Sequence, residues 1–403
     1  MSNVLTKNKT STNEGYKKTK LGWIPEEWKV FNLEELGEFS KGKGIAKKDI
    51  LENDSEGYPS IRYAEIYTSY NYYTHSLKTK VNGESVKNSN PITYGDILFA
   101  GSGETLEDIG KSIAYLGNEV AYAGGDIIIL KQNSQHSQYL GYLLNNDIVR
   151  NQLFKLGQGH SVVHIYSSGL KKVKILLPPL PEQQKIAKVL STWDKAIALQ
   201  EQLITQKQAL KKGLMQDLLT GKKRFPGFEE EWEEVKLGDI FTIKNGKDYK
   251  HLGNGEIPVY GTGGIMTYVD SFLYNGESVG IGRKGTIDKP FYLKGKFWTV
   301  DTLFYCVSFK SCIPKYLYYL FNTINWKTYN EASGVPSLSQ STIKSIKIRI
   351  PKISEQQKIA SVLSNFDIEI EKLITHKKSL IQQKQGLMQQ LLSGEKRVKI
   401  LKR

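Results

Sequence analysis

The chain has 403 residues, of which 39% are hydrophobic and 24% are charged. This length predicts two or three domains, and the composition is that of a protein with buried cores, which excludes a wholly disordered chain. No run of about 18 apolar residues occurs and the first 20 residues are polar, so we expect neither a membrane-spanning helix nor a secretory signal. Two cysteines, Cys306 and Cys312, disfavour a disulfide framework and a cysteine-based zinc site. The expected location is cytoplasmic.

The charge balance indicates a polyanionic partner. Lys and Arg number 56 and Asp and Glu number 41, so the formal net charge at pH 7 is +15. Nucleic acid is such a partner, because its phosphates bind basic surfaces. A basic surface without a nucleic-acid role is the interpretation that composition alone leaves open.

The first part of the chain combines a basic N-terminal tail, residues 1–20, with a globular segment, residues 21–177. Short runs of strand-forming residues between Gly, Asn and Ser turns predict strands at Asp96–Ala100, Asp126–Leu130 and Lys174–Leu177. Glycine-rich loops follow at Gly101–Glu104 and Gly157–Ser161, where glycine permits tight turns and a close approach to a ligand. The pattern predicts an irregular α+β domain.

Residues 178–224 predict a long helix. Pro181 suits the first helical turn, and Gly221 in a lysine-rich segment indicates the end of the helix. Seven of ten positions on a three-four spacing are apolar, which is typical of a coiled-coil seam. These positions are Ile186, Leu190, Trp193, Ile197, Gln200, Ile204, Lys207, Lys211, Leu214 and Leu218.

A second globular segment spans residues 225–350. Strands are predicted at Thr299–Val307 and Lys344–Ile350, and glycine-rich loops at Gly280–Thr286 and Ser333–Ser337. The first of these loops is read either as a plain hairpin or as a DNA-contacting loop. A phosphate-binding loop is disfavoured, because no βαβ unit follows it.

The last part of the chain, residues 351–403, repeats the helix and ends in a basic tail. Glu355–Arg397 matches Glu182–Arg224 without a gap, and 21 of the 43 residues are identical. Eight of the ten corresponding seam positions are apolar, and Gly394 corresponds to Gly221. We predict that the two helices pair within one chain, whereas pairing between two chains is the alternative.

A second repeat precedes each helix. Glu26-Glu27-Trp28 matches Glu230-Glu231-Trp232, and the similarity then fades through the globular segments. The fold class expected is therefore α+β: two globular domains, each followed by a long helix, with the helices forming an antiparallel coiled coil of pseudo-twofold symmetry. A shared frame with two diverged domains predicts one common role for the helices and two versions of another role for the domains.

These features together resemble the specificity subunit of type I restriction-modification systems. The resemblance is carried by both PxxxEQQKIAxVL runs and by GWIPEEW, IPVYGTGG, GIGRKGTI and FWTVDTLFY, which begin at Gly22, Ile257, Gly280 and Phe297. It implies two target-recognition domains that each read one half of a bipartite double-stranded DNA sequence. It also implies that the paired helices set the unread gap between the halves.

The resemblance further implies partners that carry out the chemistry. These are two modification (methyltransferase) subunits and restriction (helicase–nuclease) subunits, which would hold S-adenosylmethionine, ATP and Mg²⁺. This chain is expected to be non-catalytic, with no cofactor and no metal of its own. The residues agree, since no methyltransferase motif and no G-x-x-x-x-G-K-[ST] phosphate loop occurs. His160 and His164 are four apart but lack a metalloprotease context, so a metal site is disfavoured.

The candidates for DNA contact share polar or basic side chains in a glycine-rich or tyrosine-rich setting. Arginine pairs with guanine and glutamine with adenine in the major groove, whereas other contacts fix register on the phosphates. The candidates are Arg62, Tyr63, Ser102, Gln158, His160 and Ser161 in the first domain, and Tyr260, Thr262, Arg283, Lys284, Ser337 and Gln340 in the second.

The candidates for a partner interface are duplicated polar residues near the helix starts. Core packing explains repeated Ile, Val and Leu but not repeated polar residues, whereas two equivalent partner subunits would explain them. Helix capping with solvated charge is the alternative. The candidates are Gln183, Gln184, Lys185, Asp194, Gln356, Gln357, Lys358 and Asp367.

Three other functions stay open at this point. They are a single-chain DNA-modifying enzyme with an unrecognised site, a coiled-coil scaffold without DNA specificity, and a silent cassette of recognition domains. The bases read, the gap length, the methylated base and the half assigned to each domain are not encoded in any pattern that we recognise.

Overall fold

The computed structural model describes residues 14–51, 56–159 and 162–400, and the chain divides into two compact units. Unit 1 contains Met1–Ala198 and Lys378–Arg403, and unit 2 contains Leu199–Lys377. Each unit therefore holds one globular domain, the first half of the helix that follows it and the second half of the other helix. This division differs from the five segments expected from the sequence, because the two long helices are shared between the units.

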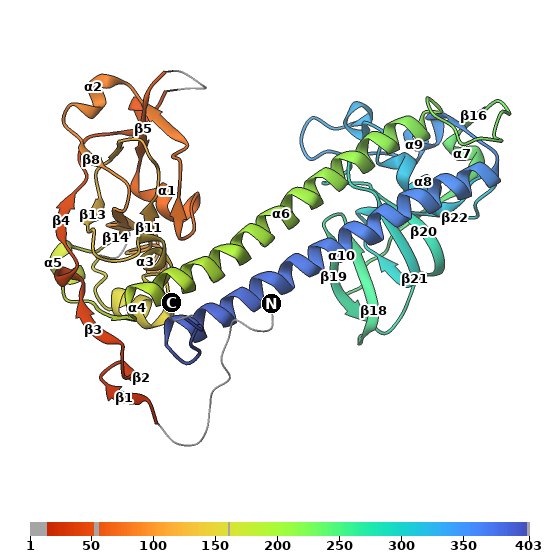
Figure 1. Ribbon diagram of the computed structural model, residues 1–403. Coiled ribbons are helices and arrows are strands. Elements are labelled where there is room, and N and C mark those ends of the chain that lie inside the picture. The colour runs from red at the N-terminus through yellow and green to blue at the C-terminus, as the bar shows by residue number, and fades with distance from the viewer. Residues whose placement is uncertain (1–13, 52–55, 160–161, 401–403) are drawn as a thin grey trace. The chain divides into compact units, whose positions relative to one another are not determined.

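The domain of unit 1 contains two sheets and three two-stranded ladders (Figure 1). The five-stranded sheet has the order β4 (Glu38–Lys41), β13 (Ile127–Lys131), β9 (Ile97–Ala100), β11 (Ser112–Tyr115) and β6 (Tyr73–Thr74). The four-stranded sheet has the order β7 (Thr79–Val81), β5 (Tyr58–Ile61), β12 (Ala121–Ala123) and β8 (Asn90–Ile92). The ladders are β1 (Tyr16–Thr19) with β2 (Gly22–Pro25), β3 (Lys29–Asn32) with β15 (Lys174–Leu177), and β10 (Ser102–Gly103) with β14 (Val163–His164).

Two cores meet at the central strands of this domain. Successive side chains of a strand point to opposite faces, so Ile97 and Phe99 of β9 enter one core while Leu98 and Ala100 enter the other. The first core also receives the helices α3 (Ser137–Leu143), α4 (Asp147–Phe154) and α5 (Ser167–Leu170) and the ends of the long helices. Helix α1 (Tyr63–Thr68) packs into the second core through Ile66, and α2 (Gly83–Val86) has no buried residue. Two 3₁₀ turns lie at Leu33–Glu35 and Lys47–Asp49.

The first described strand begins at Tyr16, before the domain boundary expected at residue 21. Tyr16–Thr19 pairs in antiparallel register with Gly22–Pro25, so the boundary falls inside a hairpin. Residues 1–13 of the expected tail lie outside the described residues. The hairpin is joined to the end of α10, because the Tyr16 hydroxyl donates a hydrogen bond to the Gly394 carbonyl at 3.0 Å.

The domain of unit 2 is built on one six-stranded sheet. Its order is β17 (Thr242–Asn245), β22 (Leu303–Val307), β20 (Tyr274–Gly282), β21 (Phe291–Thr299), β18 (Asn254–Gly261) and β19 (Gly264–Val269), and all pairs except β18–β21 are antiparallel. A further ladder joins β16 (Glu233–Lys236) to β23 (Lys347–Ile350). The helices are α7 (Leu237–Ile240), α8 (Pro314–Phe321) and α9 (Gln340–Ser345), with a 3₁₀ turn at Trp326–Tyr329.

Two predicted strands begin later than expected in this domain. Thr299 ends β21, and a turn separates it from β22, which begins at Leu303. Lys344 belongs to α9, because Ser339 caps that helix by accepting a hydrogen bond from the Thr342 N–H. The sequence did not predict the break between these elements, because the intervening residues include no glycine or proline.

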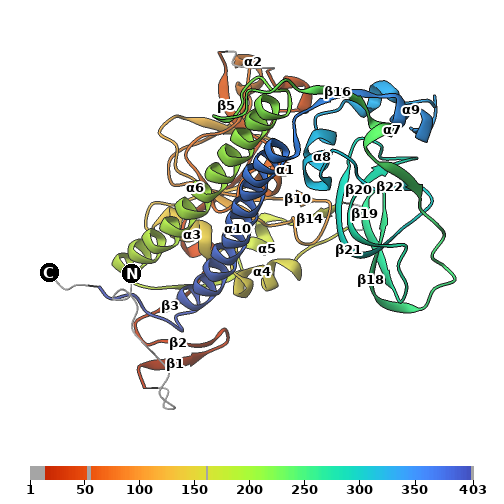
Figure 2. The ribbon, with the colours of Figure 1, turned by 90° about the vertical axis from the view of Figure 1, so that its right-hand side faces the viewer.

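The long helices are α6 (Leu180–Leu219) and α10 (Ile353–Leu392), and within each unit they run side by side (Figure 1, Figure 2). Their polar seam positions face the other helix and bond to it. In unit 2, the Lys207 ammonium lies 2.7 Å from the Glu369 carboxylate, and the Lys211 ammonium lies 2.5 Å from the Asp367 carboxylate. Residue numbers therefore increase along α6 as they decrease along α10, which means that the helices are antiparallel. The prediction of an antiparallel pair within one chain is therefore confirmed.

The same contacts occur in both units with the roles of the helices exchanged. Lys384 of α10 meets Asp194 of α6 at 2.5 Å in unit 1, as Lys211 of α6 meets Asp367 of α10 in unit 2. Each residue of one pair is displaced by 173 positions from its counterpart in the other. This is the contact pattern of a pseudo-twofold repeat.

Both helices end as the sequence predicts. Gly221 and Gly394 have φ of +74° and +77°, a left-handed conformation that favours glycine. A Cβ on Gly221 would lie 3.4 Å from the Trp232 ring, and one on Gly394 would lie 3.5 Å from the Trp28 ring. Trp232 and Trp28 therefore pack against the ends of the two long helices, which explains why the tryptophan is repeated.

Candidate nucleic-acid interface

In unit 2, the loop after β20 is joined to the loop before α9. Gly285 N–H donates to the Pro336 carbonyl at 2.8 Å, and Leu338 N–H donates to the Arg283 carbonyl at 2.9 Å. Gly285 has a φ of +93°, which a side chain would strain. The two glycine-rich segments found in the sequence thus form one paired structure.

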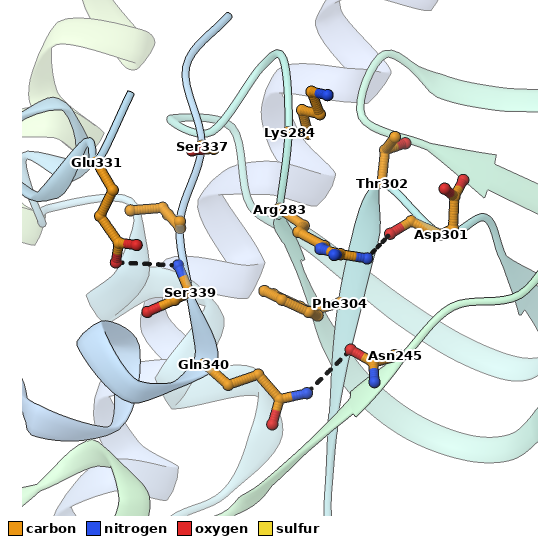
Figure 3. A pocket seen from close by; sticks show the side chains of 11 residues that line it. Asn245, Arg283, Lys284, Asp301, Thr302, Phe304, Glu331, Ser337, Ser339 and Gln340 are labelled. Atoms are coloured by element: carbon orange, nitrogen blue, oxygen red, sulfur yellow. Dashed lines mark hydrogen bonds between the residues drawn. The ribbon is translucent and has the colours of Figure 1, made fainter. Parts of the chain in front are cut away.

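This loop pair borders a pocket with a volume of about 530 Å³ (Figure 3). The Arg283 guanidinium donates through Nη1 to the Asp301 carbonyl at 3.3 Å and lies 5.9 Å from the Phe304 ring centroid. Gln340 Nε2 donates to Asn245 Oδ1 at 3.0 Å across the pocket. The structure therefore brings four of the six second-domain candidates to one pocket: Arg283, Lys284, Ser337 and Gln340.

The other two second-domain candidates lie near the end of β18. Tyr260 is half-buried and its carbonyl accepts from Val300 N–H at 2.9 Å. Burial raises the pKa of the Tyr260 phenol. A Cβ on Gly285 would lie 3.5 Å from Thr262 Oγ1, so Thr262 is beside the loop pair without lining the pocket.

In unit 1, the corresponding loops meet through β10 and β14. Ser102 Oγ and His164 Nδ1 are 2.8 Å apart, and Gln158 exchanges two backbone hydrogen bonds with His164. Ser102 is 2% exposed, so its hydroxyl supports the loop from inside, whereas Gln158 is exposed. His160 and Ser161 lie outside the described residues.

Arg62 and Tyr63 begin α1, which packs beside β10. Glu65 holds this turn: its carboxylate accepts from Arg62 N–H at 2.8 Å and lies 3.7 Å from Arg62 Nε. Tyr63 stacks at a tilt on Tyr67, with ring centroids 6.4 Å apart. Both candidates are half-buried, and they are positioned by the domain's own contacts next to the unit 1 loops.

Gly101 and Arg283 occupy the same place in the two domains. In both cases the N–H donates to the turn before the neighbouring strand, and the carbonyl accepts from the second loop. Gly101 N–H donates to the Asp126 carbonyl at 2.7 Å, and its carbonyl accepts from Ile165 N–H at 2.9 Å. Arg283 N–H donates to the Thr302 carbonyl at 2.8 Å, and its carbonyl accepts from Leu338 N–H at 2.9 Å. The backbone arrangement is therefore shared, while the side chains at this position differ.

Two of the predicted partner-interface residues are buried joints inside the chain. Gln183 is 1% exposed, accepts from His136 N–H at 3.0 Å and donates to the Pro178 carbonyl at 2.9 Å. Gln356 is fully buried, accepts from Ile313 N–H and donates to the Pro351 carbonyl at corresponding distances of 3.0 and 2.8 Å. Each Gln thus bonds the start of its long helix to the N-cap residue of a domain helix, His136 of α3 or Ile313 of α8. Gln183 and Gln356 are therefore buried inside the chain and do not lie on a surface that a partner could contact.

Asp194 and Asp367 also have intramolecular partners. Tyr142 donates its hydroxyl to Asp194, and Tyr319 donates to Asp367 at 2.5 Å, while each carboxylate pairs with a lysine of the other helix. Burial and the nearby carboxylate raise the pKa of Tyr142, so that it stays protonated as the donor. The remaining interface candidates stay available, because Gln184, Gln357 and Lys358 are exposed and Lys185 is half-exposed.

Sequence reasoning missed a buried ion pair at each helix start. Arg224 donates through Nε and Nη2 to the Glu355 carboxylate at 3.0 and 2.7 Å, and Arg397 does the same to Glu182 at 2.5 and 2.9 Å. Such two-pronged pairs are stronger and more directional than single hydrogen bonds. The duplicated Glu and the duplicated Arg at the ends of the 43-residue repeat were the available signal.

In the described part of the chain, no group of three or more His, Cys, Asp or Glu could hold a metal ion. Cys306 and Cys312 are buried free thiols, and burial raises the pKa of Cys312 to about 12. None of the described helices is long and apolar enough to cross a membrane.

Comparison with known proteins gives consistent results at the level of sequence. Residues 25–207 and 229–383 match the model for the type I restriction modification DNA specificity domain. The putative type I restriction enzyme MjaX specificity subunit of Methanocaldococcus jannaschii is 29% identical, over 96% of this chain and 97% of that protein. The MjaVIII specificity subunit of the same organism is 26% identical, over 94% and 95% of the two chains.

Solved structures share the fold. The S subunit of a type I restriction-modification system from M. genitalium has a TM-score of 0.60 and 18% identity, covering 91% of this chain and 96% of that one. The HsdS subunit of Thermoanaerobacter tengcongensis has a TM-score of 0.52 and 16% identity, covering 92% and 98%. The resemblance noted in the sequence is thereby confirmed. Since the family model matches most of the chain, in two copies, the protein belongs to the type I restriction-modification DNA specificity family.

Proposed function

We propose that this chain selects the DNA sequence on which a type I restriction-modification complex acts, with each domain reading one half of a bipartite target. The observation that carries the proposal is the shared loop pair. Gly101 and Arg283 have the same backbone bonds in their two domains but different side chains. A common scaffold with different side chains suits two domains that read different base sequences, because base edges specify and phosphates only position.

The helix pair sets the distance between the two half-sites in this proposal. Both helices are 40 residues long and continue through both units. At 1.5 Å per residue, each spans about 60 Å. The buried side chains of Gln183 and Gln356 join each domain to the start of its helix by hydrogen bonds. Domains fastened in this way would transmit helix length to DNA spacing.

The partners proposed are two modification subunits, joined by restriction subunits when DNA is cleaved. The duplicated exposed residues Gln184 and Gln357, with Lys185 and Lys358, are the contacts assigned to the modification subunits. A repeated patch suits two copies of one partner, since each copy would meet the same residues. The buried residues Gln183 and Gln356 would act indirectly, by holding the helix that presents the patch.

The chain itself is proposed to be non-catalytic and to work in the cytoplasm with its DNA. S-adenosylmethionine, ATP and Mg²⁺ are assigned to the partner subunits. The absence of a methyltransferase or phosphate-loop motif in the sequence supports this division of labour. The two unpaired cysteines suit a reducing compartment.

The test is a genome-wide map of modified bases in cells that co-express this chain with a matching modification subunit. A split motif that appears only with this chain supports the proposal and reports both half-sites and the gap. Exchanging residues 225–350 for those of a relative should change one half only. A purified complex that modifies DNA without sequence preference would contradict the proposal.

A further inference from the structure

The pocket beside the unit 2 loop pair carries both signs of charge. Arg283 and Lys284 line it together with the carboxylates of Asp301 and Glu331. Hydrogen bonds from Thr342 and Ser339 lower the pKa of Glu331, which keeps it ionised at neutral pH. The two positive and two negative charges balance, so the pocket as a whole offers a phosphate no net attraction. A base edge carries no net charge and needs only individual hydrogen bonds, so the centre of the pocket suits a base better than a phosphate.

Arg283 is held in place before any DNA arrives. Its backbone is bonded on both sides, to Thr302 and Leu338, and its guanidinium is held by the Asp301 carbonyl beside the Phe304 ring. Nη1 makes the bond to Asp301, so the edge formed by Nε and Nη2 has no hydrogen bond among the described residues. Fixing a long side chain in advance lowers the entropy lost on binding.

The free edge of the guanidinium matches one base in particular. Two parallel N–H donors fit O6 and N7 of guanine in the major groove, and no other base offers two adjacent acceptors there. Gln340 is less available, because its Nε2 already donates to Asn245 (Figure 3). Lys284 lies on the far side of Arg283 from Gln340 in the same view, and its ammonium lacks the fork geometry.

Resting on the proposed function, we infer that Arg283 reads a guanine in the half-site of the second domain through Nε and Nη2. The first domain has Gly101 at this position, which has no side chain to read a base. The guanine contact made by Arg283 therefore belongs to the half-site that changes when residues 225–350 are exchanged.

The experiment uses the complete chain in complex with its modification subunit. Modification rates are measured on DNA duplexes that carry each of the four bases at every position of the second half-site. Arg283→Ala should lower the preference for guanine at one position by roughly 10- to 100-fold. Arg283→Lys should lose the same preference although it keeps the charge, because the ammonium cannot bond both acceptors in the same way.

Lys284→Ala is the matched control from the same loop. It should weaken modification of all sequences alike and make binding less salt-dependent, as expected for a phosphate contact. The inference is overturned if Arg283→Ala also weakens all sequences alike and Arg283→Lys restores them, or if the relaxed position falls in the other half-site. A wild-type complex that shows no split motif would contradict the proposed function itself, and the role of Arg283 with it.

Discussion

Replacing Asp194 with Asn should destabilise the chain far more than replacing Lys384 with Met, although the two residues form one ion pair. The Lys384 side chain is 6% exposed, whereas that of Asp194 is 26% exposed. Asp194→Asn leaves a buried ammonium without its counter-ion, next to the Tyr72 ring at 4.1 Å. Lys384→Met leaves a carboxylate that reaches water and still accepts from Tyr142.

The magnitudes follow from burial. Leaving one charge of a buried pair uncompensated costs about 3–5 kcal/mol, and the aromatic contact offsets part of this, so we expect about 3 kcal/mol for Asp194→Asn. For Lys384→Met we expect about 1 kcal/mol. Asp367→Asn is the matched control, because it removes the counter-ion of Lys211, whose side chain is 18% exposed and therefore better hydrated than that of Lys384. Its cost should lie between the other two.

The assay is urea unfolding of the three variants, followed by circular dichroism at pH 7. Burial lowers the pKa of Lys384 from 10.5, and loss of Asp194 removes the group that raises it. Between the lowered pKa and 10.5 the unfolded chain binds more protons than the folded chain, so stability rises with pH in that window. The deficit of Asp194→Asn should therefore shrink from pH 7 to pH 10. If Lys384→Met costs as much as Asp194→Asn, the burial argument is refuted.

Three further predictions concern the joints, the helices and the loop. Arg224→Ala should lower the urea midpoint of unfolding because it leaves the buried Glu355 carboxylate without its partner, whereas Arg224→Ala combined with Glu355→Ala should recover part of the loss. An additive double variant would contradict the pairing. Inserting seven helical residues after position 198 and seven after position 377 lengthens both helices by about 10.5 Å. This should widen the gap in the mapped motif by about three base pairs and leave both half-sites unchanged. A constant gap would argue against the spacer role of the helices. Gly285→Ala should cost about 1–2 kcal/mol and relax the second half-site only, since φ is +93° there; relaxation of both halves in the modification map would show that the loop does not act locally.

The sequence predicted the parts of the fold that repeat. The 173-residue displacement, the three-four spacing and the terminal glycines located both long helices. They could do so because apolar residues recur with the helical period on the face of a helix that is buried. Strand bounds were predicted where an apolar run ends in proline, as at Lys174–Leu177, and were missed where the turn contains neither proline nor glycine, as before Leu303.

The candidate site was predicted unevenly for the same reason. Glycine-rich spacing identified the loops around Arg283 and Ser337, and the structure places both at one pocket. The three-four spacing places Gln183 on the same helix face as Ile186, whereas Gln184 lies off that face, but the partner-interface candidates were chosen by their polar side chains and not by this spacing. Polar identity alone therefore pointed to a partner surface where the chain makes an internal joint.

The sequence by itself determined that the chain is a duplicated frame with two diverged domains, because repetition and periodicity are properties of residue order. Tertiary structure decided which duplicated polar residues face inward, since Asp194 meets Lys384 from 190 positions away and Glu182 meets Arg397 from 215. It also decided that Arg283 and Gly101 are equivalent, because that equivalence lies in backbone hydrogen bonds between segments distant in the chain. Contacts of this kind depend on packing of the whole domain, which no local pattern encodes.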